Sequence, residues 1–418
     1  MNFTTRLQLS AMMFLEFFVW GAWYVTLGTF LINNLHATGA QTGSVFSTQS
    51  WGAIIAPFII GLIADRYFNA EKILAVLHLV GAVLMYQMYQ AEEVAVFYPY
   101  ALGYMILFMP TLALVNSISF NQMNDTEKEF PGIRVWGTIG WIVAGLLISF
   151  VFLWDAEANV KAGLMKNTFL LASITSLALG IFSFTLPKTP PKVSKGAKVK
   201  IAEILGLDAL KLSKDKNFLI FFIASILICI PLAFYYQYAN PFLSDIGMAN
   251  PTGKMTMGQF FEVFFLLLLP FIFKKFGFKI TILAGMLAWA IRYALFAYGN
   301  AGDLTFMLII GIILHGICYD FFFVSGQIYT NAKAGPKFKS AAQGLITLAT
   351  YGVGMLIGFE VAGLIKDAYS TTTVVNGVST IVSDWKMIWI IPSIIAIAVF
   401  LLFFIFFDDK NEKPVVPQ

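Results

Sequence analysis

Long apolar blocks separated by short polar segments are the feature that most constrains this chain of 418 residues. A block of about 20 apolar residues is long enough to cross a bilayer as a helix. The chain is 59% hydrophobic and only 12% charged, whereas a soluble domain has roughly 25% charged residues. Blocks such as 218–232 and 389–407 are apolar on every face, unlike the alternating strands of a β-barrel. The sequence therefore predicts an all-α membrane protein.

Twelve such blocks can be delimited, and each is expected to form one transmembrane helix. They lie at 8–33, 42–64, 71–90, 94–120, 132–154, 166–186, 217–243, 256–274, 278–298, 304–330, 339–366 and 386–408. The first block has no small-residue cleavage site behind it, so we expect it to remain as the first span. The Pro- and Lys-rich segment 188–216 divides the blocks six and six. This division predicts six-helix bundles at 1–187 and 217–418, with 188–216 as a cytoplasmic linker.

Lysine and arginine are concentrated in alternate loops, and basic loops usually lie on the cytoplasmic side of a membrane. The loops predicted to be cytoplasmic contain Arg6, Arg66, Lys72, Lys128, Lys274, Lys275, Lys279, Lys410 and Lys413, together with the lysines of 188–216 and 333–339. Both termini are therefore expected in the cytoplasm, and the protein in a bacterial cytoplasmic (inner) membrane. Cys229 and Cys318 lie inside apolar blocks without CxxC or Cys/His spacing, so neither a disulfide framework nor a metal site is predicted.

The loop between the second and third blocks contains Gly61, Asp65 and Arg66 in the order Gly-x-x-x-Asp-Arg. This spacing matches a signature of the major facilitator superfamily, in which the glycine allows close helix approach and the aspartate pairs at a helix end. We interpret the loop as a gating latch; the alternative is loop charges that only set topology. The tripeptide Pro-Phe-Ile occurs at 57–59 and again at 270–272, in corresponding places of the two halves. This repeat agrees with the major facilitator fold of two six-helix bundles.

Acidic residues inside the predicted spans are candidates for function, because an ionisable group is costly at membrane depth. Glu16, Glu262 and Asp320 are such residues. Glu16 has no opposite charge nearby in the sequence, and an isolated carboxyl of this kind suits a group that binds and releases a proton. The alternative is a permanently protonated carboxyl that forms a hydrogen bond between helices.

Two pairs of polar residues lie at helical spacing in the second half. Gln259 and Glu262 are three residues apart, so their amide and carboxylate share a face and could bind the vicinal hydroxyls of a ribose; a polar packing seam is the alternative. His315 and Tyr319 are four apart, and the tyrosine ring could stack on a nucleobase. The alternative for His315 is a core histidine with satisfied hydrogen bonds. Asp320 points about 100° away from this face, which suits a proton relay or a packing network.

Arg134, Thr138 and Trp141 follow one another along one face of the fifth predicted span. A cation, a hydroxyl and an aromatic ring in line make a suitable wall for an uncharged polar aromatic solute. The alternative for Arg134 is an arginine that snorkels to the cytoplasmic end of its helix. Arg292 in the ninth block has no such neighbours in the sequence, and we interpret it as structural.

Separate blocks in order along nearly the whole chain carry a family resemblance. The most specific are Phe18 to Trp23, Thr26 to Gly28, Met109 to Thr111, Asn116 to Ser119, Ile133 to Gly140, Leu205 to Ala209, Arg292 to Gly299, Tyr319 to Phe322 and Ser340 to Gly344. They resemble the nucleoside:proton symporter family of the major facilitator superfamily, the group of the enterobacterial nucleoside and xanthosine permeases. The resemblance implies a nucleoside site between the two halves, lined by Arg134, Thr138, Trp141, Gln259, Glu262, His315 and Tyr319. It also implies a proton-coupling role for Asp320, which we extend as an expectation to Glu16 and Glu262.

The chain departs from the enterobacterial relatives at several positions that bear on this site. Ala233 and Tyr236 stand where those relatives have Gln and Asn, His315 where they have Tyr, and Trp141 where they have Phe. Preference for a particular base therefore cannot be carried over. Glu16 stands where the family has Gln, which adds a carboxylate and leaves the identity of the proton site open.

The resemblance implies import of nucleosides together with protons by alternating access, with the proton as coupling ion and no other cofactor. The chain has no GxxxxGK[ST] loop for ATP, and no nucleophile and base at useful spacing favours an enzyme. The expected partners are a small-molecule nucleoside and the lipid bilayer, with no nucleic acid, and we expect a monomer. Two alternatives stay open: a sugar or oligosaccharide:H+ symporter, and an uncoupled nucleoside facilitator or drug exporter.

Overall fold

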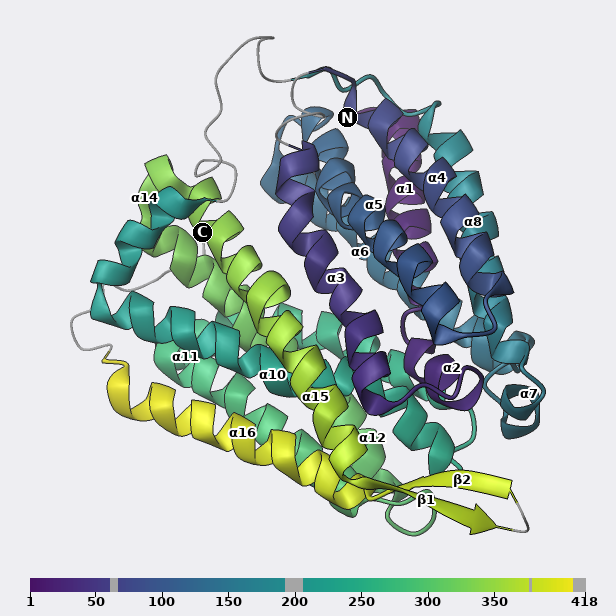
Figure 1. Ribbon diagram of the computed structural model, residues 1–418. Helices are drawn as coiled ribbons and strands as arrows, with labels where there is room; N and C mark the ends of the chain where they lie inside the picture. The colour runs from purple at the N-terminus through teal and green to yellow at the C-terminus, as the bar shows by residue number, and fades with distance from the viewer. Residues whose placement is uncertain (61–66, 192–205, 376–377, 409–418) are drawn as a thin grey trace. The chain divides into compact units, whose positions relative to one another are not determined.

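The computed structural model describes residues 1–60, 67–191, 206–375 and 378–408, most of which lie in helices (Figure 1). The chain forms two compact units. The first contains residues 1–37, 48–200 and 249–256, and the second contains residues 38–47, 201–248 and 257–418. The helices α3 (Gly39–Ile59) and α11 (Pro251–Tyr298) each contribute residues to both units.

The first unit is a bundle of long helices joined by short ones. Its remaining helices are α1 (Phe3–Gly21), α2 (Leu27–Asn33), α4 (Ala70–Gln90), α5 (Val94–Asn121), α6 (Thr126–Leu146), the π-helix η2 (Leu147–Val151), α7 (Glu157–Lys161), the 3-10 turn η3 (Leu164–Lys166) and α8 (Asn167–Ser183). Helix α4 packs against α5 and α8, and α1 packs against α6. Buried apolar side chains of these helices form the core, among them Met12, Leu74, Leu114, Ile133 and Leu179. Because lipid is as apolar as these side chains, close packing and hydrogen bonds hold such helices together.

The second unit is built around α10, which packs against both α15 and α16. Its helices, besides most of α11, are the 3-10 segment η4 (Leu207–Lys214), α10 (Lys216–Asp245), α12 (Thr305–Ile313), α13 (His315–Tyr319), the π-helix η5 (Asp320–Val324), α14 (Ser325–Thr347), the π-helix η6 (Leu348–Gly354), α15 (Met355–Ala368) and α16 (Trp385–Phe406). Figure 1 shows α10, α15 and α16 as neighbours in this unit. Asp215 and Asp384 cap the first turns of α10 and α16 by accepting hydrogen bonds from backbone N–H groups, which have no partner inside a helix.

The first apolar block does not form one continuous helix. The sequence predicts a single span at 8–33, but α1 ends at Gly21 and α2 begins at Leu27. Between them the Thr26 hydroxyl donates a hydrogen bond to the Trp23 carbonyl at 3.1 Å, and the Tyr24 hydroxyl donates to Gln49. Polar side chains thus supply hydrogen bonds that allow the helix to be interrupted inside an apolar block.

A glycine interrupts α11 between two of the predicted blocks. Gly277 has a φ of 75° inside this helix, a left-handed conformation that glycine adopts without steric cost. The interruption falls between the predicted blocks 256–274 and 278–298. A similar interruption occurs in α14 at Gly335, whose φ is 65°, close to the end of the predicted block 304–330.

Nine helical segments within the described residues are long and apolar enough to cross a membrane. One of them is α11, with its interruption at Gly277. The blocks at 8–33 and 42–64 have no counterpart among the nine. Helices α1 and α3 in these blocks are long enough, with 19 and 21 residues, but their polar residues make them less apolar than the nine. The described residues therefore contain fewer qualifying segments than the twelve predicted blocks.

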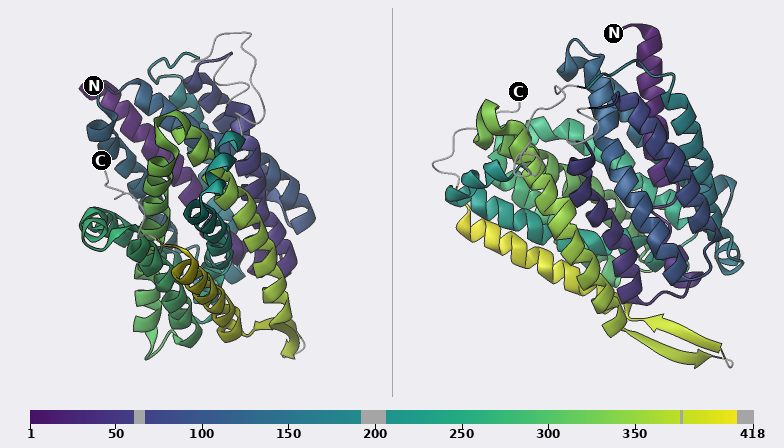
Figure 2. Two further views of the ribbon diagram at one scale, coloured as in Figure 1. Left: turned by 90° about the vertical axis from the view of Figure 1, so that its left-hand side faces the viewer. Right: turned by 45° about the horizontal axis from the view of Figure 1, so that its top comes forward.

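A two-stranded hairpin corrects the prediction of an entirely helical chain. Strand β1 (Ser370–Val375) pairs antiparallel with β2 (Val378–Ser383), with Ser370 opposite Ser383. Figures 1 and 2 show the hairpin at the ends of α15 and α16. The segment is rich in threonine and valine, whose branched side chains favour strands. The segment lies between the predicted blocks 339–366 and 386–408, where no element was predicted. The Lys366 ammonium donates to Ser370 at 3.0 Å and to Ser383 at 2.7 Å and holds the base of the hairpin.

Candidate functional site

Helices α11 and α13 approach each other closely in the second unit. A Cβ atom added at Gly316 would lie 2.7 Å from the Cα and the backbone nitrogen of Glu262, so the approach depends on the missing side chain. It brings the turn containing Gln259 and Glu262 against the turn containing His315 and Tyr319. His315 is buried, and the other three side chains are half-buried. The structure therefore brings together the two pairs that the sequence predicted separately.

His315 lies between a buried arginine and an aromatic ring. Nη1 of Arg292 lies 3.0 Å from Nδ1 of His315. Since arginine can only donate, Nδ1 accepts, and the hydrogen of a neutral ring is left on Nε2. The guanidinium carbon of Arg292 lies 3.4 Å from the centroid of the Tyr235 ring, which stacks on His315 at 5.1 Å. Arg292 is therefore in direct contact with a predicted site residue, which its sequence neighbours did not indicate.

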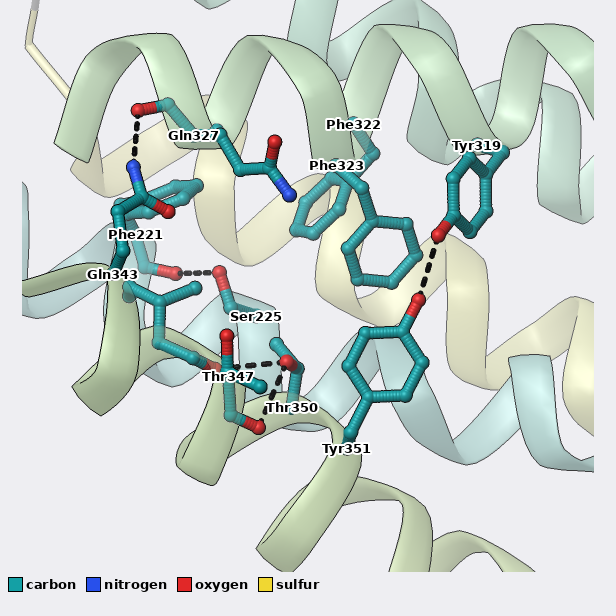
Figure 3. A pocket seen from close by; sticks show the side chains of 12 residues that line it. Phe221, Ser225, Tyr319, Phe322, Phe323, Gln327, Gln343, Thr347, Thr350 and Tyr351 are labelled. Atoms are coloured by element: carbon teal, nitrogen blue, oxygen red, sulfur yellow. Dashed lines mark hydrogen bonds between the residues drawn. The ribbon is translucent and has the colours of Figure 1, made fainter. Parts of the chain in front are cut away.

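An open pocket lies beside Tyr319 in the second unit (Figure 3). Its cavity volume is about 70 Å³, which is smaller than the roughly 300–1,000 Å³ of a typical small-molecule site. The Tyr319 hydroxyl lies 2.7 Å from the hydroxyl of Tyr351. Aromatic rings, amides and hydroxyls line the pocket, contributed by Phe221, Ser225, Tyr319, Phe322, Phe323, Gly326, Gln327, Gln343, Ile346, Thr347, Thr350 and Tyr351. Tyr319 belongs both to this lining and to the predicted substrate-binding residues; the other six of those residues are not in the lining.

Asp320 begins the π-helix η5 and is 1% exposed. Its Oδ2 atom has no hydrogen-bond partner among the described residues. The charge of Glu262 acts on this carboxyl, so two acidic groups of the second unit interact. Single-turn π-helices occur frequently at functional sites because they redirect side chains. A proton bound by either carboxyl would relieve the repulsion between two like charges.

The predicted stripe on α6 lies against α1 in the first unit. The Arg134 guanidinium carbon lies 4.2 Å from the centroid of the Phe17 ring. Trp141 contacts Trp20 edge to face, with centroids 5.5 Å apart. Arg134, Thr138 and Trp141 are all half-buried. Neighbouring residues of α1 thus support the cation and the aromatic ring of the stripe.

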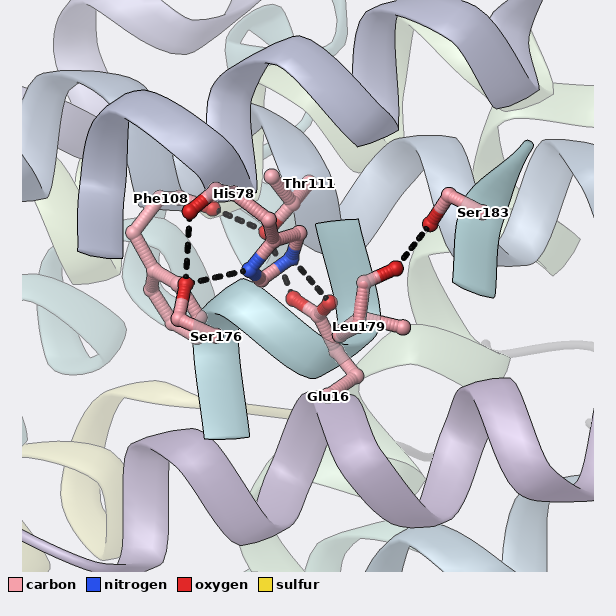
Figure 4. A network of polar contacts seen from close by, with 7 residues as sticks. All are labelled: Glu16, His78, Phe108, Thr111, Ser176, Leu179 and Ser183. Carbon is pink, nitrogen blue, oxygen red and sulfur yellow. Dashed lines mark hydrogen bonds and ion pairs between the residues drawn. The ribbon is translucent and has the colours of Figure 1, made fainter. Parts of the chain in front are cut away.

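Glu16 is the centre of a buried polar network in the first unit (Figure 4). Its Oε2 atom lies 2.8 Å from Nε2 of His78 on α4, and its Oε1 atom accepts from the Thr111 hydroxyl at 2.5 Å. Nδ1 of His78 lies 3.0 Å from the Ser176 hydroxyl on α8. Sequence reasoning missed His78 because it lies 62 residues from Glu16. The available signal was an ionisable histidine inside an apolar block.

The predicted gating residues Gly61, Asp65 and Arg66 lie outside the described residues. Within the ranges that the structure does describe, no group of three or more His, Cys, Asp or Glu side chains could hold a metal ion. Cys229 and Cys318 are buried free thiols. The described candidate residues offer hydrogen bonds, aromatic faces and carboxyls that can exchange protons.

Comparison with known proteins gives relatives along the whole chain. YegT of Escherichia coli (strain K12), to which nucleoside transport is ascribed, is 43% identical over 412 residues, covering 98% of this chain and 95% of YegT. The xanthosine permease of the same organism is 34% identical over 421 residues, covering 97% of this chain and 96% of the permease. A crystal structure of the nucleoside transporter NupG superposes with a TM-score of 0.84 at 30% identity, over 98% of this chain and 100% of that one.

A sequence model of one family matches residues 1–412. That family is described as the nucleoside H+ symporters, the one that the sequence blocks resemble. The match therefore confirms the prediction made from the sequence, and the extent and identity of the similarity to the relatives agree with it. This chain belongs to the nucleoside H+ symporter family.

Proposed function

We propose that this protein imports nucleosides together with protons by alternating access. The observation that carries the proposal is the approach of α11 to α13, which sets a carboxylate and an amide against a histidine and a tyrosine. Membership of the nucleoside H+ symporter family supports it, as do relatives named as nucleoside and xanthosine permeases.

The proposal includes the architecture of the membrane domain. In this proposal the protein has twelve spans in two six-helix bundles, 1–187 and 217–418. A cytoplasmic linker at 188–216 joins the bundles, as the apolar blocks predict. The TM-score of 0.84 with NupG supports a major facilitator fold. The basic loops favour a bacterial inner membrane with both termini in the cytoplasm. The protein acts as a monomeric transporter, not as an enzyme; the proton is its coupling ion, and it needs no further cofactor.

Each binding residue has a role that its chemistry supports. Glu262 accepts hydrogen bonds from the ribose hydroxyls, and Gln259 donates to and accepts from the sugar or base. Nε2–H of His315 donates to the base, since Arg292 occupies Nδ1. Tyr319 stacks on the base. Arg134, Thr138 and Trp141 also bind substrate in this proposal, as a cation, a hydroxyl and an aromatic ring in line.

Proton coupling in this proposal uses the acidic pair Glu262 and Asp320. Their charges interact, so a proton bound at Asp320 favours the ionised form of Glu262 that holds the ribose. A proton that crosses ~150 mV supplies about 3.5 kcal/mol, enough for roughly a 300-fold solute gradient. The loop with Gly61, Asp65 and Arg66 acts as the cytoplasmic latch during the exchange of conformations.

The test is uptake of labelled uridine and adenosine into vesicles, with and without an inward proton gradient, for the wild type and Glu262→Gln. We expect the wild type to accumulate nucleoside when the gradient is present and Glu262→Gln to lose this accumulation. Glu92→Gln is the control and should retain it, because Glu92 is an exposed carboxyl of the same type. Equal accumulation in all three proteins would remove Glu262 from the site.

The same vesicles separate the alternatives. Uptake of sugars without competition by nucleosides would favour the sugar symporter. Nucleoside uptake that ignores external pH and membrane potential would favour the uncoupled facilitator. Energy-dependent expulsion of hydrophobic compounds, with no nucleoside uptake, would favour the drug exporter.

A further inference from the structure

A histidine and a glutamate meet in the core of the first unit, away from the residues assigned to nucleoside binding. Glu16 on α1 is 0% exposed and His78 on α4 is 2% exposed. The 2.8 Å contact between Glu16 Oε2 and His78 Nε2 is drawn in Figure 4. Two buried ionisable groups in direct contact are costly in a membrane protein unless they share a proton or a function.

The hydrogen bonds around His78 define where the ring hydrogen lies. The Ser176 hydroxyl has one hydrogen, which it donates to the His78 carbonyl at 2.9 Å. Its oxygen must then accept from Nδ1 of His78, 3.0 Å away. A neutral His78 therefore presents a lone pair at Nε2, toward Glu16.

A proton must occupy the space between Nε2 of His78 and Oε2 of Glu16. Without it, a lone pair would face a carboxylate oxygen at 2.8 Å, and the buried charge of Glu16 would have no compensating cation there. With one proton, either Glu16 is neutral and donates to His78, or His78 is a cation and donates to Glu16. Both forms have a net charge of zero, so the contact is stable only when it holds one proton.

In the described part of the chain, no other charged side chain forms a hydrogen bond or ion pair with Glu16 or His78. Helices α5 and α8 contain no Asp, Glu, Lys or Arg; on α5 the Thr111 hydroxyl donates to Glu16, and the Tyr104 hydroxyl interacts with the Glu16 charge. Helix α4 has two charged residues in its first turn: Glu71, whose carboxylate accepts from the Thr189 N–H, and the exposed Lys72. The cation on α6 that faces α1 is Arg134, which lies over the Phe17 ring.

We propose that Glu16 and His78 form a second proton-binding site, which binds and releases one proton in each transport cycle. Loss of the proton separates α1 from α4, and its return closes them together. The inference rests on the proposed function, since it adds a second coupling proton to the one held by Glu262 and Asp320.

Helix α1 connects this pair to the proposed nucleoside wall within the same unit. Phe17 is next to Glu16 in the chain, and its ring centroid lies 4.2 Å from the Arg134 guanidinium carbon. The ring centroid of Trp20, one turn further along α1, lies 5.5 Å from that of Trp141. A movement of α1 that follows the proton therefore changes the positions of Arg134 and Trp141. This route explains how a proton held away from the solute affects its binding.

The experiment measures the proton-to-nucleoside ratio in vesicles from the reversal potential of uridine flux, together with uridine counterflow at equal pH. Glu16→Gln keeps a donor toward His78 Nε2 but cannot release a proton. We expect the proton-to-nucleoside ratio of Glu16→Gln to be lower by one proton. The limiting accumulation of uridine should then be lower by roughly 300-fold at ~150 mV, while uridine counterflow is retained. Ser183→Ala is the matched control, because Ser183 donates to the Leu179 carbonyl in the same core without a titratable group.

A second variant keeps the proposal testable if Glu16→Gln does not fold. His78→Gln leaves Glu16 without its proton partner, so we expect uptake to fall when external protons are scarce and to recover as their concentration rises. An unchanged ratio in Glu16→Gln with intact counterflow, or a loss in His78→Gln that acid does not reverse, would overturn the second site. Absence of proton-driven uridine uptake in the wild type would instead overturn the proposed function, and the inference with it.

Discussion

Asp367 of α15 caps the start of α3: its Oδ1 atom accepts a hydrogen bond from the Gly39 N–H at 2.5 Å, and its Oδ2 atom accepts from the Ala40 N–H at 2.8 Å. These residues all belong to the second unit. Asp155 of the first unit has the same relationship to α11, since it accepts from the Thr252 N–H at 3.0 Å. In both cases an aspartate far away in sequence satisfies the donors at a helix start.

Asp367→Ala is expected to lower the stability of the protein by about 0.5–2 kcal/mol, the usual effect of losing a helix cap. The measurement is the midpoint of thermal unfolding in detergent. Asp303→Ala is the control, because Asp303 is exposed and lies in a loop. Equal midpoints for Asp367→Ala and the wild type would contradict the capping role.

Asp320→Asn is expected to lower proton-driven accumulation by the contribution of one proton while nucleoside counterflow continues. The asparagine cannot release a proton, so the coupling step is lost but the binding residues remain. Limiting accumulation should fall by up to roughly 300-fold at ~150 mV. The check is uridine uptake with and without a proton gradient, beside Asp303→Asn. A limiting accumulation by Asp320→Asn equal to that of the wild type would exclude Asp320 from coupling.

Arg292→Met is expected to change which nucleosides are bound. Without the guanidinium, the His315 hydrogen can move to Nδ1, and Nε2 then accepts where it formerly donated. Loss of the hydrogen bond from the neutral His315 ring to the base costs ~0.5–1.5 kcal/mol, or about 2- to 13-fold in affinity. Competition of uridine uptake by a series of nucleosides measures the effect. Arg292→Lys is the control, because it keeps a cation beside His315. If Arg292→Met binds the nucleosides in the same order of preference as the wild type, Arg292 has only a packing role.

The pH dependence of stability should contain a contribution from Asp215, at the start of α10. Partial burial raises the pKa of this carboxyl, but hydrogen bonds from the Phe218 N–H and the Lys333 ammonium outweigh it and leave the pKa below its ordinary value. Because the pKa is lower in the folded state than the unfolded value of about 3.9, the stabilisation is complete above that pH. It is lost as pH falls through the folded pKa.

Asp215→Asn should therefore lower the unfolding midpoint at pH 7, and this difference should shrink as pH falls below about 3.9 and through the folded pKa. Asp215 is 46% exposed, so solvent screening limits the difference to less than ~1 kcal/mol. Glu157→Gln serves for comparison: a hydrogen bond from Lys161 lowers the pKa of Glu157, but in a fully exposed pair we expect no measurable change. If the difference between the unfolding midpoints of the wild type and Asp215→Asn grew as pH falls, the pKa of Asp215 would not be lowered by folding.

Local pattern was enough to predict the class of this protein and its family. The length and polarity of the apolar blocks depend only on neighbouring residues, and they predict a helical membrane protein. The family prediction is confirmed by the match over residues 1–412. Helical spacing also paired Gln259 with Glu262 and His315 with Tyr319, because residues three or four apart always share a face.

Tertiary structure alone decided which of these faces meet. Gly316 shows how the two pairs come together, since its missing side chain lets α13 reach Glu262. The partner of Glu16 is His78, 62 residues away, and that of His315 is Arg292, 23 residues away. Such contacts depend on which helices pack and how each is rotated, and helical spacing along one segment contains no information about either. The sequence by itself therefore determined which groups lie at membrane depth, and the packing of the helices determined which of them share a proton.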